Sequence, residues 1–203
     1  MADERFLSGP NEVAAALDAL DSEDAVSLPL LDESARGRLL AAATSAAYRP
    51  ARAEIGSGDS LVRQNMDVCA DFADSSPFHD FTRRFQVLVR AAAARLGQNP
   101  FQGVLCLDDL VLQRYEPGPM GITAHRDSLR YINVAALFTL AGEARFALCA
   151  DRDGRASRDI DAAPGTVILL RAPGFRGTNR RPFHLVSDIR SGRYSFGLRQ
   201  RGG

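Results

Sequence analysis

His125 and Asp127 stand two residues apart, separated by Arg126. Side chains alternate between the two faces of a β-strand, so an imidazole and a carboxylate at this spacing point to the same side. Of the other two histidines, His79 falls at the start of an expected helix and His184 falls in a second short strand pattern. Two histidines and one carboxylate form the facial triad of non-haem Fe(II) oxygenases. We therefore expect His125, Asp127 and His184 to hold a metal ion. The alternatives are that His125 and Asp127 are merely surface residues at a strand end, or that all three form a hydrogen-bonded structural group.

The residues 193–200 carry a second pattern with a period of two. One face of the expected strand holds Arg193, Ser195, Gly197 and Arg199, and the other face is apolar. Buried arginine is unfavourable unless it is paired with an anion. A planar guanidinium binds a carboxylate through two parallel hydrogen bonds. The pattern is therefore consistent with a bound dicarboxylic acid such as 2-oxoglutarate.

Residues 112–200 resemble the AlkB-like branch of the Fe(II)/2-oxoglutarate dioxygenases. Four motifs carry this resemblance and occur in the family's order: QRYEPG at 113–118, HRD at 125–127, the later His184, and RYSFGLRQ at 193–200. The resemblance implies a double-stranded β-helix with Fe(II) held by His125, Asp127 and His184. It covers a little under half of the chain.

The same resemblance implies that 2-oxoglutarate binds to Tyr115, to Arg193 through its distal carboxylate, and to Arg199 near its other end. Ser195 and Gln113 would add contacts, at places where such enzymes often have asparagine. Dioxygen would take the remaining metal position. The implied activity is that of an oxidoreductase that oxidises, most often hydroxylates, a substrate with release of succinate and carbon dioxide. The cofactors carry this chemistry, while the protein orients the C–H bond.

A small-molecule or peptide-like substrate is expected, and the charge pattern favours an anionic one. Residues 171–201 hold eight arginines against one aspartate, although the formal net charge of the chain is zero. The candidate substrate contacts are Arg126, between the two ligands, and three arginines of the loop before His184. Those three are Arg176, Arg180 and Arg181. A solvated basic loop is the alternative interpretation.

Oxidative dealkylation of nucleic-acid bases is a second hypothesis, because it is the activity that the AlkB resemblance suggests. A nucleic-acid binder usually has a basic excess, which this chain lacks. There is no tryptophan, and residues 48–74 are poor in aromatics that could stack on a base. Leu129 stands where AlkB-type repair enzymes often carry a second aspartate. A third hypothesis is a non-enzymatic cupin-like binding protein, which would leave Arg193 and Arg199 without a purpose.

The elements that must position these residues change type near residue 100. The first part has helical patterns at Asn11–Leu20, Asp32–Ala47 and Phe78–Leu96, a strand at Ala25–Leu30, and an irregular segment, 48–74, that could cover the site. The second part has short strands separated by Gly, Pro and Asp, at Val104–Tyr115, Ile122–Asp127, Tyr131–Leu140, Ala144–Ala150, Val167–Arg171, Phe183–Ile189 and Arg193–Gln200. The expected fold class is α+β: a double-stranded β-helix, or jelly-roll and cupin-like barrel, buttressed by N-terminal helices.

The whole chain fits one soluble domain, 1–203, with 1–100 as mainly helical support and 101–203 as the barrel with the site. It has 203 residues and 45% hydrophobic content, enough for a single core. Three widely spaced cysteines show no zinc or disulfide pattern. The first residues have no apolar run, and no stretch is long enough to span a membrane. We therefore expect a cytoplasmic protein with no membrane partner; the sequence leaves the substrate, the outcome of oxidation and the oligomeric state open.

Overall fold

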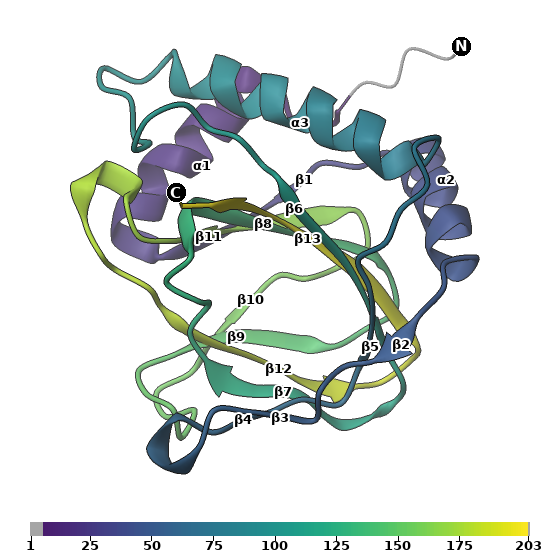
Figure 1. Ribbon diagram of the computed structural model, residues 1–203. Coiled ribbons are helices and arrows are strands. Elements are labelled where there is room, and N and C mark those ends of the chain that lie inside the picture. Colours follow the sequence, from purple (N-terminus) through teal and green to yellow (C-terminus); the bar gives the residue numbers. More distant parts are fainter. Residues whose placement is uncertain (1–5, 203) are drawn as a thin grey trace.

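Two antiparallel β-sheets lie face to face in the computed structural model, which describes residues 6–202 (Figure 1). The larger sheet has the spatial order β1 (Ala25–Pro29), β11 (Thr166–Arg171), β8 (Tyr131–Ala141), β13 (Arg193–Arg201), β6 (Asp109–Tyr115), β5 (Asp67–Cys69) and β2 (Arg49–Pro50). The smaller sheet has the order β10 (Arg158–Ile160), β9 (Arg145–Cys149), β12 (Phe183–Ile189) and β7 (Gly118–His125). This architecture confirms the predicted double-stranded β-helix.

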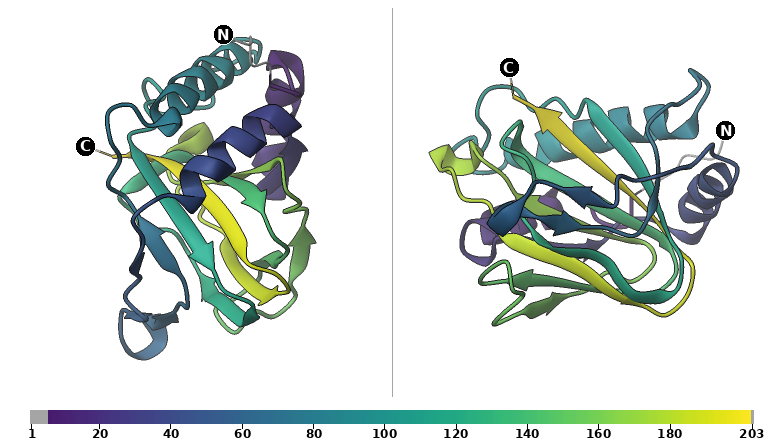
Figure 2. Two further views of the ribbon diagram at one scale, coloured as in Figure 1. Left: turned by 90° about the vertical axis from the view of Figure 1, so that its right-hand side faces the viewer. Right: turned by 60° about the horizontal axis from the view of Figure 1, so that its bottom comes forward.

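Three helices, α1 (Pro10–Glu23), α2 (Glu33–Thr44) and α3 (Pro77–Ala93), lie on the outer side of the larger sheet (Figure 2). The helix α2 begins where predicted, because the Asp32 carboxylate accepts a hydrogen bond of 2.7 Å from the Ala35 backbone N–H. The helix α1 begins earlier than expected: its N-cap is Gly9 rather than Asn11. Pro10 suits the first turn because it has no N–H to leave unpaired.

Aromatic side chains join α3 to the larger sheet. Phe78, Phe81 and Phe85 recur at helical spacing and are buried. The Phe81 ring meets Phe138 of β8 edge-on, with centroids 5.1 Å apart, and Phe138 stacks on Phe196 of β13 at 4.4 Å. Edge-on and stacked pairs of this kind add to the free energy gained from apolar burial. The helices therefore fix the larger sheet from behind.

The strand β13 separates two cores. Phe196 and Leu198 are fully buried in the core between helices and sheet, whereas Arg193 and Ser195 face the space between the two sheets. A second apolar core, which includes Tyr115, fills part of that space. The predicted alternation along this strand is confirmed, and it directs its arginines into the barrel.

The segment 48–74 is more ordered than its sequence suggested. Besides β2 and β5, it forms a small hairpin of β3 (Glu54–Ile55) and β4 (Val62–Arg63). It then runs beside β7, where the Asn65 N–H donates to the Gly121 carbonyl at 2.7 Å. Strands this short have too few residues for a detectable period, so the sequence could not reveal them.

Residues 104–108 depart from the predicted strand, since β6 begins only at Asp109. Side chains of α3 hold this stretch instead: Gln86 accepts from the Leu107 N–H at 2.7 Å, and Arg90 donates to the Leu105 carbonyl. Of the helices in residues 6–202, none has the length and apolar character needed to cross a membrane.

Candidate active site

The two histidines of the expected triad lie on adjacent strands. His125 ends β7 and pairs in register with His184 of β12. Asp127 follows β7, and its Oδ1 lies 3.9 Å from Nε2 of each histidine. The three ligand atoms all lie within 4.8 Å of one another. The structure therefore brings together the three residues that the sequence selected.

Backbone carbonyls orient both imidazoles. His125 Nδ1 lies 2.9 Å from the Thr123 carbonyl oxygen, and His184 Nδ1 lies 3.3 Å from that of Pro182. A donor at Nδ1 leaves Nε2 with the free lone pair that a metal needs. Burial lowers the pKa of His184 to about 3, with a further contribution from the nearby His125, and burial also lowers the pKa of His125. Both imidazoles are thus neutral at pH 7, the form that binds a metal.

Arg199 holds the carboxylate of the triad. Its Nε lies 2.7 Å from Asp127 Oδ2, which leaves Oδ1 toward the histidines. Burial alone would raise the pKa of Asp127, but Arg199 and the two histidines together hold this pKa well below its usual value. A Cβ at Gly197 would lie 2.6 Å from Arg199 Nη1. Glycine at this position therefore leaves free the space that the Arg199 guanidinium occupies.

The donor set of the triad fits Fe(II). It offers two neutral imidazole nitrogens and one ionised carboxylate on one side, with no thiolate. Oxygenase iron sites use this combination because it leaves neighbouring coordination positions open. Phe146 stacks on His184, with ring centroids 5.6 Å apart, and limits the access of water from that side.

Arg193 is the centre of a buried polar cluster between the sheets, which we call the anion pocket for the ligand that it could hold. It is 4% exposed, and its Nη1 and Nη2 donate to the hydroxyls of Ser195 at 2.9 Å and Thr139 at 3.1 Å. Its Nε is buried without a hydrogen-bond partner, and no carboxylate among residues 6–202 pairs with it. Burial lowers the pKa of Arg193, since nothing nearby compensates the charge apart from a weak effect of Tyr115. A carboxylate ligand would satisfy this guanidinium.

Gln113 and Tyr115 of β6 complete this pocket. The Ser195 hydroxyl donates to Gln113 Oε1 at 3.4 Å, and the Tyr115 ring lies 5.4 Å from Arg193 Cζ. Burial raises the pKa of Tyr115, and Arg193 and Arg199 both oppose this rise. Tyr115 is therefore close to both arginines, so the anion pocket and the triad are neighbours.

Thr139 is a pocket residue that sequence reasoning missed. It lies on β8 directly opposite Ser195 of β13. A buried threonine in a largely apolar strand is a sign of a polar contact, but it does not reveal which side chain Thr139 meets. The signal lies in the pairing of two distant strands, which becomes visible only in the folded chain.

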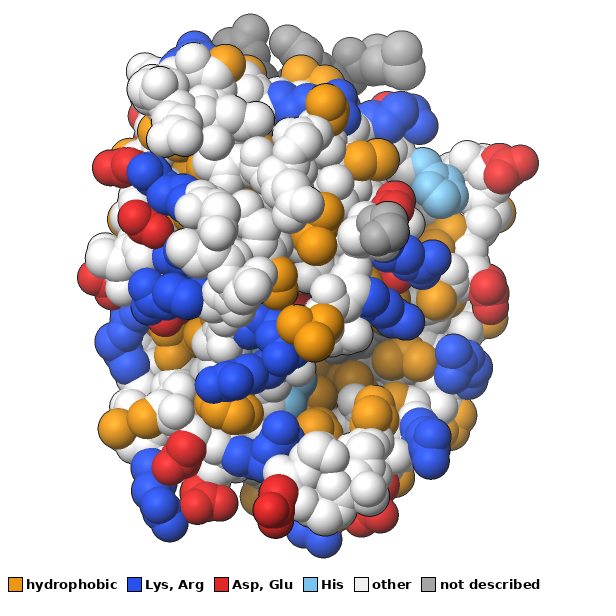
Figure 3. All heavy atoms as spheres, turned by 60° about the vertical axis from the view of Figure 1, so that its left-hand side comes forward, with side chains coloured by type: hydrophobic (Ala, Val, Ile, Leu, Met, Phe, Trp, Pro, Cys, Tyr) orange, Lys and Arg blue, Asp and Glu red, His pale blue; other side chains and the backbone are white. Residues whose placement is uncertain are grey.

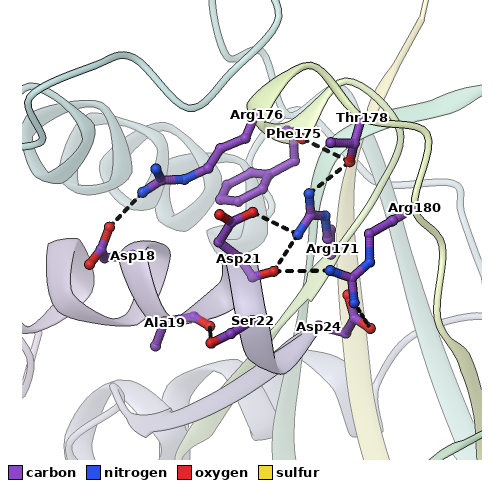
Figure 4. A network of polar contacts seen from close by, with 10 residues as sticks. All are labelled: Asp18, Ala19, Asp21, Ser22, Asp24, Arg171, Phe175, Arg176, Thr178 and Arg180. Carbon is purple, nitrogen blue, oxygen red and sulfur yellow. Dashed lines mark hydrogen bonds and ion pairs between the residues drawn. The ribbon is translucent and has the colours of Figure 1, made fainter.

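The four arginines proposed for substrate divide into two pairs. Arg176 pairs with Asp18 at 2.5 Å and Arg180 pairs with Asp24 at 2.8 Å, both on the helix α1 side of the loop (Figure 4). These two guanidinium groups are engaged by carboxylates and fasten the loop. The structure thus pairs both with aspartates, whereas the sequence analysis proposed them as substrate contacts with a solvated basic loop as the alternative.

The other two arginines lie beside the triad. Arg181 Nη1 donates to the Asp127 backbone carbonyl at 2.6 Å. The Arg126 guanidinium lies over the Phe183 ring, with its Cζ 4.0 Å from the centroid. Burial lowers the pKa of Arg181, and the positive charge of Arg126 adds to the effect. These two side chains therefore remain candidates for contact with a substrate.

A hollow opens at the barrel end that carries the triad, where β7 ends and β12 begins; we call this end the mouth. Figure 3 shows a histidine ring inside the hollow, with basic side chains around it. The chain has no lysine, so every basic side chain in that view is an arginine. The mouth is thus open to solvent and positively charged.

Comparisons with known proteins show the fold. No family model matches the chain, and no curated protein matches its sequence. Among solved structures, it is similar to a prolyl hydroxylase in complex with a hypoxia inducible factor peptide fragment from Trichoplax adhaerens, with 14% identity, a TM-score of 0.68, and coverage of 95% of this chain and 90% of that one. An oxidoreductase of the 2OG-Fe(II) oxygenase family from Burkholderia pseudomallei matches with 14% identity, a TM-score of 0.64 and coverage of 97% and 94%.

The structure of OsALKBH1 is also similar, with 18% identity, a TM-score of 0.59, and coverage of 87% of this chain and 98% of that one. At such identities the similarity shows a shared double-stranded β-helix rather than a shared activity. The matches include prolyl hydroxylases as well as this AlkB-type structure, so the AlkB-like branch is not singled out.

Proposed function

We propose that the protein is an Fe(II)- and 2-oxoglutarate-dependent dioxygenase that hydroxylates a small-molecule or peptide-like substrate. One observation carries this proposal: a buried arginine that has no carboxylate partner among residues 6–202 and a His–Asp–His cluster lie inside the same double-stranded β-helix. Neither feature benefits the fold by itself, because an unpaired buried cation and three clustered ionisable groups are both costly. Iron and 2-oxoglutarate together would offset both costs.

Each residue of the site would have a distinct task. His125, Asp127 and His184 would hold Fe(II), and Arg199 would keep the carboxylate ionised and in place. Arg193 would bind the distal carboxylate of 2-oxoglutarate, assisted by hydroxyls beside it. When bound, the iron and the keto acid supply the oxidising power from dioxygen, with succinate and carbon dioxide as co-products.

The protein's own contribution is orientation and the exclusion of water. Apolar side chains of the inner core, such as Ile122, Leu148 and Val186, surround the site on the smaller sheet. A dry wall protects a reactive centre from side reactions and strengthens charge interactions near it. The mouth leaves one direction open, from which a substrate C–H bond could approach.

A thermal unfolding experiment tests the two cofactor sites together. A ligand that binds only the folded protein raises its melting temperature. We expect Mn(II) to raise it, and 2-oxoglutarate to raise it further only when Mn(II) is present. In His184→Ala both shifts should be lost. A shift with Mn(II) but none with 2-oxoglutarate would contradict the proposal and favour a cupin-like metal-binding protein.

Dealkylation of nucleic-acid bases is the second candidate. It is supported by the motif resemblance and by the similarity to the OsALKBH1 structure. The neutral net charge and the pairing of arginines near the mouth with aspartates argue against a continuous phosphate-binding surface. Binding of single-stranded DNA or RNA that weakens steeply with added salt would favour this candidate over the first.

A further inference from the structure

Three arginines that make no ion pair with any of the described residues, 6–202, gather at the mouth. Arg126 and Arg152 both lie over the Phe183 ring, with their Cζ atoms 4.0 Å and 5.5 Å from its centroid. Arg181 reaches in from the start of β12 to the Asp127 backbone. We call Arg126, Arg152 and Arg181 the rim arginines. Phe183 directly precedes His184, so the group lies along the edge of the triad.

Arg152 was not expected at this place from the sequence. It lies in the turn after β9, and its Nη1 is buried without a hydrogen-bond partner among residues 6–202. A buried N–H of a guanidinium that lacks an acceptor is unfavourable by the full cost of its desolvation. An oxygen atom of a ligand would remove that cost.

The carboxylates near the rim arginines are engaged elsewhere. Asp127 pairs with Arg199, and Asp24 pairs with Arg180. In the turn itself, Asp151 and Asp153 both lie beside Arg155, at 3.7 Å and 3.0 Å. The rim arginines make no ion pair within the part of the chain that the structure describes. Among residues 6–202, the half-buried Arg152 and Arg181 and the exposed Arg126 are therefore available to an anion from outside the chain.

Space for a ligand is present beside the rim arginines. A hollow of about 470 Å³ is lined by Arg126, Arg181 and Phe183, by the ion pair of Arg180 with Asp24, and by apolar side chains such as Leu129 and Leu148. Arg152 does not line it directly and approaches it through the Phe183 ring. Its lining combines guanidinium groups with apolar side chains, as in sites that bind small molecules. Figure 3 shows how the arginine side chains surround the opening in which a histidine is visible.

We propose that the rim arginines form an anion subsite for the carboxylate or phosphate group of a small-molecule substrate. The proposal rests on the proposed dioxygenase activity, whose substrate class it narrows. An oxyanion held at the rim would fix one end of the substrate, so that a C–H bond elsewhere in it can reach the triad. Guanidinium groups suit this task because they bind oxyanions through paired hydrogen bonds.

Nucleic acid fits the same surface less well. A strand of DNA or RNA needs a basic path that follows several phosphates, together with aromatic faces for its bases. Here the arginines next to the rim pair with Asp18, Asp21 and Asp24 of α1 and its C-cap, which places negative charge where the strand would continue. The single aromatic ring in the cluster, Phe183, is already covered by arginine.

Calorimetric titration with three matched probes tests the subsite. Phenylacetate and phenyl phosphate carry the two anionic groups, and phenylacetamide is the neutral analogue. The protein is loaded with Mn(II) and 2-oxoglutarate so that Arg193 is occupied. We expect both anions to bind and the amide to fail. The double variant Arg126→Gln/Arg152→Gln should weaken anion binding about tenfold or more, as the loss of charge-assisted hydrogen bonds predicts.

Arg155→Gln is the matched control. It removes one positive charge from the same turn as Arg152. The partners of Arg155 are the carboxylates of Asp151 and Asp153. We expect its affinity for both anions to stay within about twofold of wild type, since an exposed charge at a distance is screened. The ratio of phenylacetate to phenyl phosphate affinity would show which of the two groups the natural substrate carries.

The outcomes separate the subsite from the proposed activity. Equal affinities for wild type and the double variant, equal binding of the amide, or no binding of either anion would overturn the subsite. The subsite for a small-molecule anion would also be overturned if a single-stranded oligonucleotide bound far more tightly than both probes and lost affinity in the double variant. If 2-oxoglutarate does not bind at all, the titration is repeated in Arg193→Gln; rim-dependent anion binding there would retain the subsite while the dioxygenase proposal fails.

Discussion

Two groups of arginines in the molecule differ in their partners. The clamp arginines, Arg171, Arg176 and Arg180, all reach aspartates of α1 or its C-cap (Figure 4). Arg193 and the rim arginines reach none. The clamp holds the loop of residues 172–183 against the N-terminal helix. The second group ranges from the buried Arg193 to the exposed Arg126 and makes no ion pair among residues 6–202.

The difference indicates which arginines belong to the fold and which to a site. An ion pair inside the folded chain satisfies a guanidinium whether or not a ligand is bound. An unpaired buried guanidinium costs free energy until a ligand arrives, so it is retained only where a ligand is bound. The two groups should therefore respond in opposite ways to substitution: loss of stability for one and loss of binding for the other.

The largest effect is expected for Arg193→Gln. It should weaken 2-oxoglutarate binding by about 100-fold, because two charge-assisted hydrogen bonds are lost. The free energy of unfolding without ligand should stay equal or rise, since an uncompensated buried charge is removed. Calorimetry and denaturant unfolding measure the two quantities. Arg201→Gln, at the exposed end of the same strand and paired with Asp109, is the control that should leave 2-oxoglutarate affinity unchanged.

Arg171→Gln should produce the reverse pattern. The Arg171 side chain is 1% exposed and contacts Asp21 at 2.8 Å, while Asp21 itself is 49% exposed and can regain water. We expect a loss of about 1–3 kcal/mol in the free energy of unfolding. Affinity for 2-oxoglutarate should not change. A variant as stable as wild type would contradict the structural role given to the clamp.

The pH dependence of stability extends the comparison to His184. An ordinary histidine has a pKa of 6.5, and burial lowers the pKa of His184 to about 3. Between these values the unfolded chain binds a proton that the folded chain excludes, so the metal-free protein should lose stability as the pH falls from 6.5 toward 3. The lowered pKa of Asp127 acts in the same direction, but only below its ordinary value of 3.8.

Denaturant midpoints between pH 7 and pH 4.5 measure this dependence in the window where Asp127 contributes least. His184→Gln removes one of the two imidazoles whose pKa burial lowers and should make the curve shallower, while His125 keeps part of the dependence. A wild-type curve as flat as that of the variant would show that the cavity accepts a charged imidazole. The site would then not be the dry cavity that the unpaired Arg193 implies.

The smallest effect is expected for Arg176→Ala. This side chain is 31% exposed and its partner Asp18 is 69% exposed, so solvent screens the pair. The expected loss of unfolding free energy is below about 1 kcal/mol. A loss as large as that in Arg171→Gln would mean that the clamp acts as one cooperative network, which a double variant of both arginines would reveal.

Much of the barrel could be predicted because its long strands are regular. The period of two in β13 located both the apolar face with Phe196 and the polar face with Arg193 before any pairing was known. The same rule predicted that His125 and Asp127 share a face, but the strand ends at His125, two residues before its predicted end, and Asp127 reaches the histidines from just beyond it. The short strands β2–β5 and β10 escaped prediction, because two or three residues show no period and their pairing depends on strands far away in the sequence.

The site was predictable where a motif marks its residues and not where only the register of distant strands brings them in. Thr139 reaches Arg193 only through the register of β8 with β13, and Arg152 reaches Phe183 only through the turn after β9. The sequence also could not separate Arg176 from Arg181, because the partner that distinguishes the former lies in α1. Partners at such distances are set by packing, which local patterns do not contain.

Anaerobic titration of the Fe(II)-loaded protein with 2-oxoglutarate tests most directly whether the anion pocket and the triad form one site. The keto acid gives a weak visible charge-transfer band only when it chelates the iron. We predict that the wild-type band appears and saturates, that it needs much higher concentrations in Arg193→Gln, and that it is absent in His184→Ala. A folded, iron-loaded wild type without the band would contradict the account.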